Sequence, residues 1–286
     1  MSMNIQFLKS INILQDIEYP ERLLHFRPTM KSVSLLNRLL LRGDFRERTY
    51  SVIAPYGTGK SLTCAYLTQL VENRTTHDTE LLIHTVSDRM VAVDPALASF
   101  SRERMSSKFK GMAIALEGYQ PNLVESLREA TVSAIKRNKL GRVPTAFTMS
   151  KEEEVQVNQG RALDKLLTAL VKFAEKKKVD RIVLVWDEFG RHLEELVGNG
   201  QGPALAIVQQ LAEKIARVTD LTISFATITH RAFNSYQENL PTNEQQEWNK
   251  VNGRFTSYSY TDDTIEIYEL LGDVIDGLQI SSGASK

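Results

Sequence analysis

Buried strands and amphipathic helices alternate in the pattern of apolar and polar positions along the chain. Unbroken apolar runs predict buried strands over residues 49–54, 111–117, 182–186 and 221–228. Apolar residues at helical spacing predict helices over residues 59–73, 122–137, 161–178 and 203–217. Strands that alternate with helices form a parallel sheet that is covered on both faces. The sequence therefore predicts an α/β fold of three layers around a central, mostly parallel sheet.

The two ends of the chain add further elements to this pattern. Four leucines at helical spacing predict an amphipathic helix over residues 30–42, and Thr29 stands where it would cap that helix. Near the C-terminus we expect a short strand at 255–260, a helix over 262–278 and a disordered tail. The polar stretches 74–108 and 138–160 are predicted to be irregular loops. We accordingly expect an N-terminal helical segment (1–48) that packs on a core (49–260), followed by residues 261–286.

Composition narrows the class of protein without naming a function. Among the 286 residues, 35 lysines and arginines balance 35 aspartates and glutamates. A neutral chain does not bind nucleic acid or an anionic membrane by overall charge, although a local basic patch is compatible with neutrality. The single cysteine, Cys64, excludes an intramolecular disulfide and a zinc site of several cysteines, and we expect it to be buried. No apolar run approaches the length of about 18 residues that a membrane span needs, so we expect a cytoplasmic protein without membrane contact.

The first candidate for chemistry lies between the predicted strand 49–54 and the helix that follows it. Residues 54–61 read Ala-Pro-Tyr-Gly-Thr-Gly-Lys-Ser and match the phosphate-binding pattern G-x-x-x-x-G-K-[ST], except that Ala54 replaces the first glycine. Two glycines let the backbone N–H groups curl around phosphates, and the helix N-terminus adds a positive dipole. A chance match in a turn is the alternative, which the strand before and the helix after disfavour. The predicted nucleotide contacts are Pro55, Tyr56, Gly57, Thr58, Gly59, Lys60, Ser61 and Leu62.

A second candidate is the pair of acids that ends the apolar strand 182–186. Next to a phosphate-binding loop, Asp187 would hold Mg²⁺ together with Ser61, and Glu188 would deprotonate the attacking water. Lys60 would reach the β- and γ-phosphates. The alternative is an acidic pair that caps a helix, which the upstream loop disfavours. The presence of both acids favours hydrolysis of the nucleotide over binding alone.

These two motifs resemble the Walker A and Walker B motifs of AAA+ type ATPases, which belong to the additional-strand P-loop NTPases. The similarity spans residues 30–275 and implies a P-loop NTPase fold with ATP and Mg²⁺ as cofactors. AAA+ modules carry a lid of several helices after the last core strand, but here only residues 261–286 follow. The resemblance therefore implies a reduced or truncated lid, or a chain that is part of a longer protein. The run from ITHRAF through WNKVNGRF is similar to ATPase modules of bacterial anti-phage defence proteins.

The resemblance also assigns roles to residues after the strand 221–228. Thr229 and His230 stand where AAA+ proteins carry the sensor-1 residue, which contacts the γ-phosphate or the attacking water, and the sequence does not choose between them. The alternative role of His230 is that of a hydrogen-bonded loop histidine. Arg254 lies in a Gly-Arg-Phe stretch whose arginine, in AAA+ proteins, projects into the nucleotide site of a neighbouring subunit. Its alternative role is a surface arginine paired with an acid. Arg191 is a second cation candidate, either at a subunit interface or balancing the nearby acids.

Two smaller expectations concern segments outside these motifs. Phe26, Arg27 and Pro28 are predicted to lie over the adenine. Basic residues cluster within 100–110, where a loop would contact a substrate or line a pore: Arg102, Arg104, Lys108 and Lys110.

Together these features predict a Mg²⁺-dependent ATPase. We expect it to act as a homo-oligomer, a ring or another ATP-dependent assembly, that remodels an effector protein or nucleic acid or gates an effector. The alternative is a nucleotide-dependent oligomerisation switch with slow turnover. A kinase of small molecules is disfavoured because no arginine-rich phosphate lid is present.

Overall fold

The computed structural model describes residues 12–148, 159–199, 204–238 and 240–260. Within these residues, five strands form one sheet in the order β2-β3-β4-β1-β5, and every neighbouring pair is parallel. The strands are β1 (Thr49–Ile53), β2 (Lys110–Glu117), β3 (Val179–Asp187), β4 (Thr222–Thr229) and β5 (Thr256–Ser259). The predicted parallel α/β sheet is therefore confirmed, whereas the predicted helix over 262–278, the tail and part of the predicted loop 138–160 lie outside the described residues.

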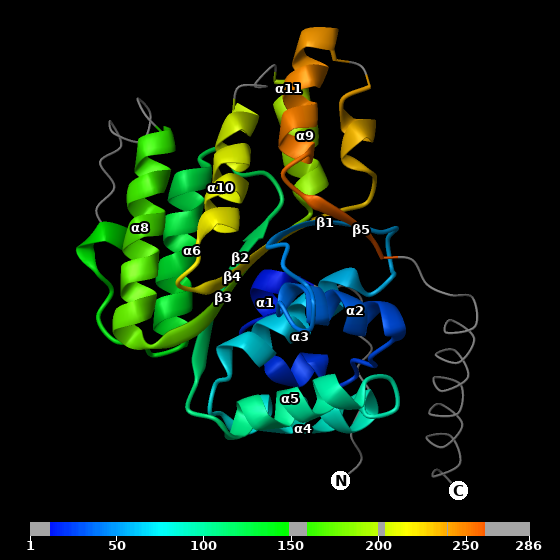
Figure 1. The fold of residues 1–286 in the computed structure, drawn as a ribbon, viewed down its shortest axis with the longest axis vertical. Helices are drawn as coiled ribbons and strands as arrows, with labels where there is room; N and C mark the ends of the chain where they lie inside the picture. The colour runs from blue at the N-terminus through cyan, green and yellow to red at the C-terminus, as the bar shows by residue number, and fades with distance from the viewer. Residues whose placement is uncertain (1–11, 149–158, 200–203, 239, 261–286) are drawn as a thin grey trace, which may run out of the picture.

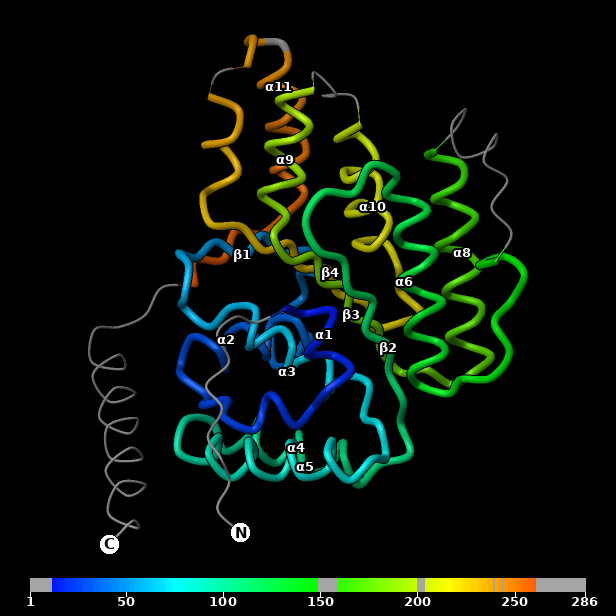
Figure 2. Tube along the Cα trace, turned by 180° about the vertical axis from the view of Figure 1, so that it is seen from behind, coloured from blue at the N-terminus to red at the C-terminus, as the bar shows by residue number. Residues whose placement is uncertain are grey.

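Helices cover both faces of this sheet (Figures 1 and 2). One face carries α1 (Ile13–Asp16), α2 (Met30–Leu39), α3 (Lys60–Glu72), α4 (His77–Met90) and α5 (Pro95–Ser106). The other carries α6 (Leu123–Arg137), α8 (Gln159–Lys177), α9 (Phe189–Gly198), α10 (Leu205–Arg217) and α11 (Thr242–Asn252). Short 3-10 helices lie at Pro20–Leu23, Thr145–Phe147 and Phe233–Tyr236.

Alternate residues of each strand point to opposite faces, so the sheet separates two hydrophobic cores. In β2, Met112 and Ile114 belong to the core beneath α6 and α8, whereas Ala113 and Ala115 belong to the core beneath α3. Burial on both faces explains why the strands appear as unbroken apolar runs in the sequence. This arrangement confirms the three layers. Cys64 of α3 is fully buried, as expected.

The prediction of an irregular segment at 74–108 was wrong, because the segment forms α4 and α5. Thr76 caps α4 by accepting a hydrogen bond from the Thr79 N–H group, and Asp94 caps α5 by accepting one from Leu97. The apolar residues of both helices face the core and alternate with many polar ones, which hid their helical spacing. Three further helices were also missed. The helix α1 is only four residues long and α11 is strongly polar, whereas α9 has apolar residues at helical spacing that directly follow the two acids.

The expected substrate-contacting loop within 100–110 is also corrected by the structure. Arg104 is only 5% exposed and donates two hydrogen bonds to the Asp180 carboxylate, at 2.7 and 2.9 Å. It also donates to the carbonyl groups of Leu70 and Val71 at the end of α3. A cation at a helix C-terminus satisfies carbonyls that have no partner within the helix. Arg104 is therefore a packing residue that joins α5, α3 and β3.

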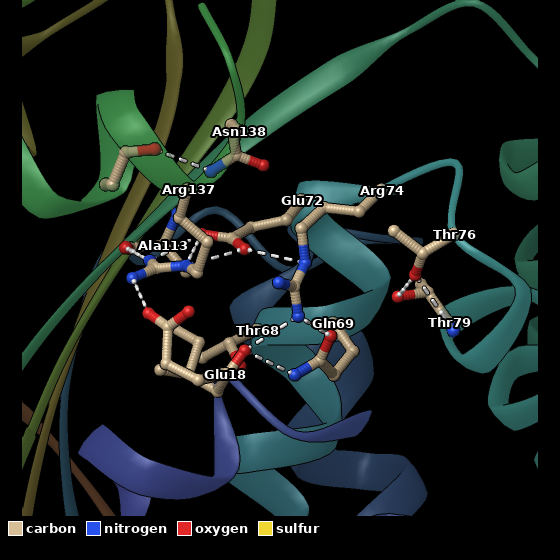
Figure 3. Close-up of polar contacts among 12 residues, drawn as sticks. Glu18, Thr68, Gln69, Glu72, Arg74, Thr76, Thr79, Ala113, Arg137 and Asn138 are labelled. Carbon is tan, nitrogen blue, oxygen red and sulfur yellow. Dashed lines mark hydrogen bonds and ion pairs between the residues drawn. The ribbon is translucent and has the colours of Figure 1, made fainter. Parts of the chain in front are cut away.

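A buried ion pair connects the N-terminal segment to the core (Figure 3). The Arg137 guanidinium donates to both carboxylate oxygens of Glu72, which is fully buried, and to the Ala113 carbonyl group at 2.8 Å. It also pairs with Glu18 at 3.0 Å. Burial lowers the pKa of Arg137, but the neighbouring carboxylates of Glu72 and Glu18 raise it overall. This cluster joins α3, β2, α6 and the segment after α1.

Within the described ranges, no helix has the length and apolar character needed to cross a membrane.

Candidate functional site

The candidate site lies at the edge of the sheet where the parallel strands β1, β4 and β3 end side by side. Ile53 is the register partner of Thr229, and Trp186 is the partner of Thr227. The glycine loop (residues 54–59) follows β1, and Asp187 ends β3. The strand order therefore brings together the glycine loop after β1, Thr229 at the end of β4 and Asp187 at the end of β3, although they are far apart in the sequence. Ligands bind at such edges in open α/β sheets.

The glycine loop has the backbone that its glycines were predicted to allow. Gly57 and Gly59 adopt φ values of +78° and +84°, in the left-handed region that side chains disfavour. A Cβ atom added at Gly57 would meet nothing within 4 Å, so backbone conformation rather than space demands glycine there. Ala54 is not among the residues with positive φ, and its N–H group donates to the Thr229 carbonyl at 3.1 Å. Alanine can therefore occupy the position of the first glycine of the pattern without backbone strain.

The helix behind the loop presents its first turn to the same place. Gly59 is the N-cap residue of α3, and no side chain caps this end. The N–H groups of a first helical turn have no partner within the helix, so they are available to an anion. Tyr260 contacts the first turn of α3, where its hydroxyl group lies 2.7 Å from the Thr63 Oγ1 atom. Sequence reasoning missed this tyrosine, since nothing local connects it to α3.

Lys60 lies between the loop and the acids. Its side chain is 5% exposed, and its Nζ atom donates to the Pro55 carbonyl at 3.2 Å. Burial lowers the pKa of Lys60, while Asp187 and, to a smaller extent, Glu188 act in the opposite direction. The charges of both acids therefore act on the Lys60 ammonium group.

The two acids occupy different environments. Asp187 is 5% exposed, and its Oδ1 atom accepts a hydrogen bond from the Glu188 N–H group at 2.8 Å. Glu188 has a φ of 50°, a conformation that is strained for a residue other than glycine and is often found at functional sites. Its carboxylate forms an ion pair with Arg191 at 3.0 Å. Arg191 thus balances a local acid, which is one of its two predicted roles.

A third carboxylate, Glu117, was not predicted. It ends β2 as the register partner of Asp187, and the Asn12 Nδ2 atom donates to both of its oxygens, at 3.0 and 2.8 Å. Burial raises the pKa of Glu117, and the charge of Glu188 adds to this shift. The acid at the end of the predicted strand 111–117 was the available signal. Even so, no group of three or more His, Cys, Asp or Glu side chains in the described part of the chain could hold a metal ion.

The two sensor candidates both lie at this edge. Thr229 is 1% exposed, and its Oγ1 atom is buried with no hydrogen-bond partner among the described residues. His230 stacks on Tyr56 of the glycine loop, with the ring centroids 3.4 Å apart. Burial lowers the pKa of His230, and the charge of Lys60 lowers it further.

The structure does not bring Arg254 to this site. Its carbonyl group accepts a hydrogen bond from the hydroxyl group of Thr49, the first residue of β1, so Arg254 lies at the opposite edge of the sheet. Its half-exposed guanidinium pairs with Glu213 of α10 at 2.9 Å. Within one chain Arg254 is therefore a surface arginine with an acidic neighbour.

The residues predicted to cover the adenine occupy unlike environments. Phe26 is buried, with its ring 5.1 Å from that of Tyr66 on α3, and Arg27 is exposed. Phe26 is therefore a core residue in this structure.

A scan against protein-family models finds no match to this chain. A search of the curated proteins finds no match either. Any function for the site rests on the residues and their geometry.

Proposed function

We propose that the chain binds ATP with Mg²⁺ and hydrolyses it at this edge of the sheet. The observation that carries the proposal is the strand order, which places the glycine loop after β1 and the acids Asp187 and Glu188 after β3 at one edge of the sheet, on either side of β4. The position of β4 between β1 and β3 fits the additional-strand group that the motifs resemble.

The residues present fit a triphosphate and its metal. Left-handed glycines, an uncapped helix end and a buried lysine together favour an anion with several charges. The N–H groups of the loop and Lys60 would hold the phosphates. Ser61 and Asp187 would hold Mg²⁺, an ion that proteins commonly bind through one or two side chains, with phosphate and water completing its shell.

Hydrolysis would use Glu188 as the general base. The water molecule would be oriented toward the γ-phosphate. When the carboxylate accepts a proton from this water, the water becomes a better nucleophile. Thr229 or His230 would contact the γ-phosphate or the attacking water. By resemblance to AAA+ modules, assembly would complete the site with Arg254 of a second copy, and the assembly would act on an effector protein or nucleic acid, with a role in anti-phage defence.

One observation favours the alternative of a slow nucleotide-dependent switch. Glu188 is ion-paired with Arg191 at 3.0 Å, and a carboxylate oxygen that contacts an arginine is not free to orient a water molecule until the pair opens. Mass photometry with a non-hydrolysable ATP analogue, together with phosphate release, separates the two functions. Assembly with slow turnover that no DNA, RNA or protein stimulates favours the switch, whereas stimulated turnover favours the remodelling machine.

The central test compares nucleotide binding with turnover in two variants. Lys60→Ala is expected to lose both, because the phosphates lose their cation. Glu188→Gln is expected to keep ATP binding while phosphate release falls about a hundredfold or more. Matched controls are Lys136→Ala and Glu80→Gln, at exposed positions of α6 and α4, which should match the unmodified chain. An unmodified chain that does not bind ATP, or full turnover in Glu188→Gln, would contradict the proposal.

A further inference from the structure

The tip of the glycine loop carries an aromatic contact that its phosphate-binding pattern does not require. Tyr56 is 75% exposed, yet its ring stacks on His230 with 26° between the ring planes. The Lys60 Nζ atom lies 5.5 Å from the centroid of the same ring. One tyrosine thus contacts both the lysine of the loop and the first residue after β4.

The residues on either side of His230 contact other elements of the fold. Before it, the Thr229 carbonyl accepts the hydrogen bond from Ala54 of the glycine loop. After it, Arg231 pairs with Glu194 of α9 at 2.7 Å. The imidazole itself has two neighbours in the glycine loop, the backbone of Ala54 and the ring of Tyr56. The ring of Tyr56 is the side chain that lies flat against it.

The His230 imidazole carries a polar atom suited to a ligand. Its Nδ1 atom is buried and has no hydrogen-bond partner among the described residues. The charged groups that act on this ring come from three elements: Lys60 of α3, Asp187 of β3 and Arg191 of α9. A buried ring nitrogen without a partner costs free energy unless a ligand or a water molecule satisfies it.

We propose that Tyr56 is a positioning residue, whose ring holds the His230 imidazole where it contacts the γ-phosphate or the attacking water. The inference rests on the proposed ATPase function and goes beyond it by choosing His230 as the contact over Thr229, because the ring of Tyr56 stacks on His230. Reaction rates depend steeply on such placement, so loss of the stack should slow turnover more than it weakens binding.

The test is a double-mutant cycle on the 286-residue chain. Tyr56→Ala is expected to lower kcat about tenfold or more with little change in ATP affinity. Tyr56→Phe is expected to restore kcat, because it keeps the ring and removes only the hydroxyl group. His230→Ala and the double variant should be equally slow, since the tyrosine acts through the histidine. Tyr19→Ala, at another exposed tyrosine, is the matched control and should behave like the unmodified chain.

Three results would overturn the positioning role: unchanged kcat in Tyr56→Ala, a Tyr56→Phe variant as slow as Tyr56→Ala, or losses that add in the double variant. Retained ATP binding shows that each variant is folded. No turnover in the unmodified chain would overturn the proposed function together with this inference, whereas turnover that is insensitive to Tyr56 would overturn this inference alone.

Discussion

His192, on the helix that follows the two acids, is a buried imidazole held in its neutral form. It is 2% exposed and lies against Trp186, with the ring centroids 4.6 Å apart. Its Nδ1 atom accepts a hydrogen bond from the Gln120 N–H group at 3.3 Å, which links the loop after β2 to α9. Burial lowers the pKa of His192 to about 4. The packing of His192 against Trp186 and Gln120 therefore depends on pH.

His192 predicts a loss of stability in mild acid. Its ordinary pKa is 6.5 and its folded pKa is about 4, so protons bind the unfolded chain more readily. Stability is unaffected above the ordinary value and falls as pH drops toward the folded value, by up to about 3 kcal/mol. Urea unfolding from about pH 7 to about pH 5 should show this fall in the unmodified chain, with a weaker pH dependence in His192→Gln. The exposed His84 offers the control variant His84→Gln, and equal slopes in all three chains would contradict the prediction.

At the scale of elements, the helix α3 is held at both ends. Tyr260 contacts its first turn through Thr63, and Glu72 in its last turn pairs with Arg137 of α6. These contacts fix the axis of the helix against the sheet, and the axis determines where the glycine loop points. The position of the loop thus depends on contacts some 20 Å away, since a helix rises about 1.5 Å per residue.

The buried pair of Glu72 and Arg137 predicts a large loss of stability when it is broken. Arg137→Ala leaves the buried Glu72 carboxylate with the longer ion pair to Arg74 at 3.5 Å and the Ala113 N–H group, which should lower the free energy of unfolding by about 3 kcal/mol. Replacing both residues by methionine should recover much of this loss, because the buried carboxylate is removed and Arg74 keeps its hydrogen bonds to the Ile17 carbonyl and to Gln69. Denaturant unfolding measures both effects, with Lys136→Ala at the neighbouring exposed position as the control. A change below about 1 kcal/mol in Arg137→Ala would show that the pair does not stabilise the fold.

At the scale of the whole molecule, the sheet separates the glycine loop from Arg254. Parallel strands place the loop at their carboxyl ends and Arg254 at the opposite edge, before β5. A single copy therefore cannot use Arg254 at its own site without unfolding β5. The half-exposed guanidinium is nevertheless accessible to a second copy, because exposed ion pairs such as the one with Glu213 are weak.

Mixing two inactive variants tests this arrangement. Arg254→Ala alone and Lys60→Ala alone are each expected to lack turnover. Their mixture should regain phosphate release, because a Lys60→Ala chain still supplies Arg254 to an intact site of the other variant. Arg217→Ala removes another exposed arginine and should keep full turnover. Full turnover in Arg254→Ala, or an inactive mixture, would exclude the role between copies.

Local patterns in the sequence were enough to predict the α/β class, the central strands and the glycine loop. Apolar runs, helix caps and glycine patterns can each be recognised from residues that are close together in the chain. Asp187 and Glu188 were found for the same reason, since they end an apolar run. The segment 74–108 was misjudged because its apolar faces are narrow and its caps are single residues.

Tertiary structure alone decided which side chains meet. Asn12 and Glu117 are 105 residues apart, and neither their contact nor the stack of Tyr56 on His230 leaves a local signal. The same holds for Arg254, whose distance from the glycine loop follows from the strand direction. The sequence by itself determined the elements and the chemical groups, because local periodicity encodes burial. Strand order then determined the site, because it sets which strand ends lie side by side.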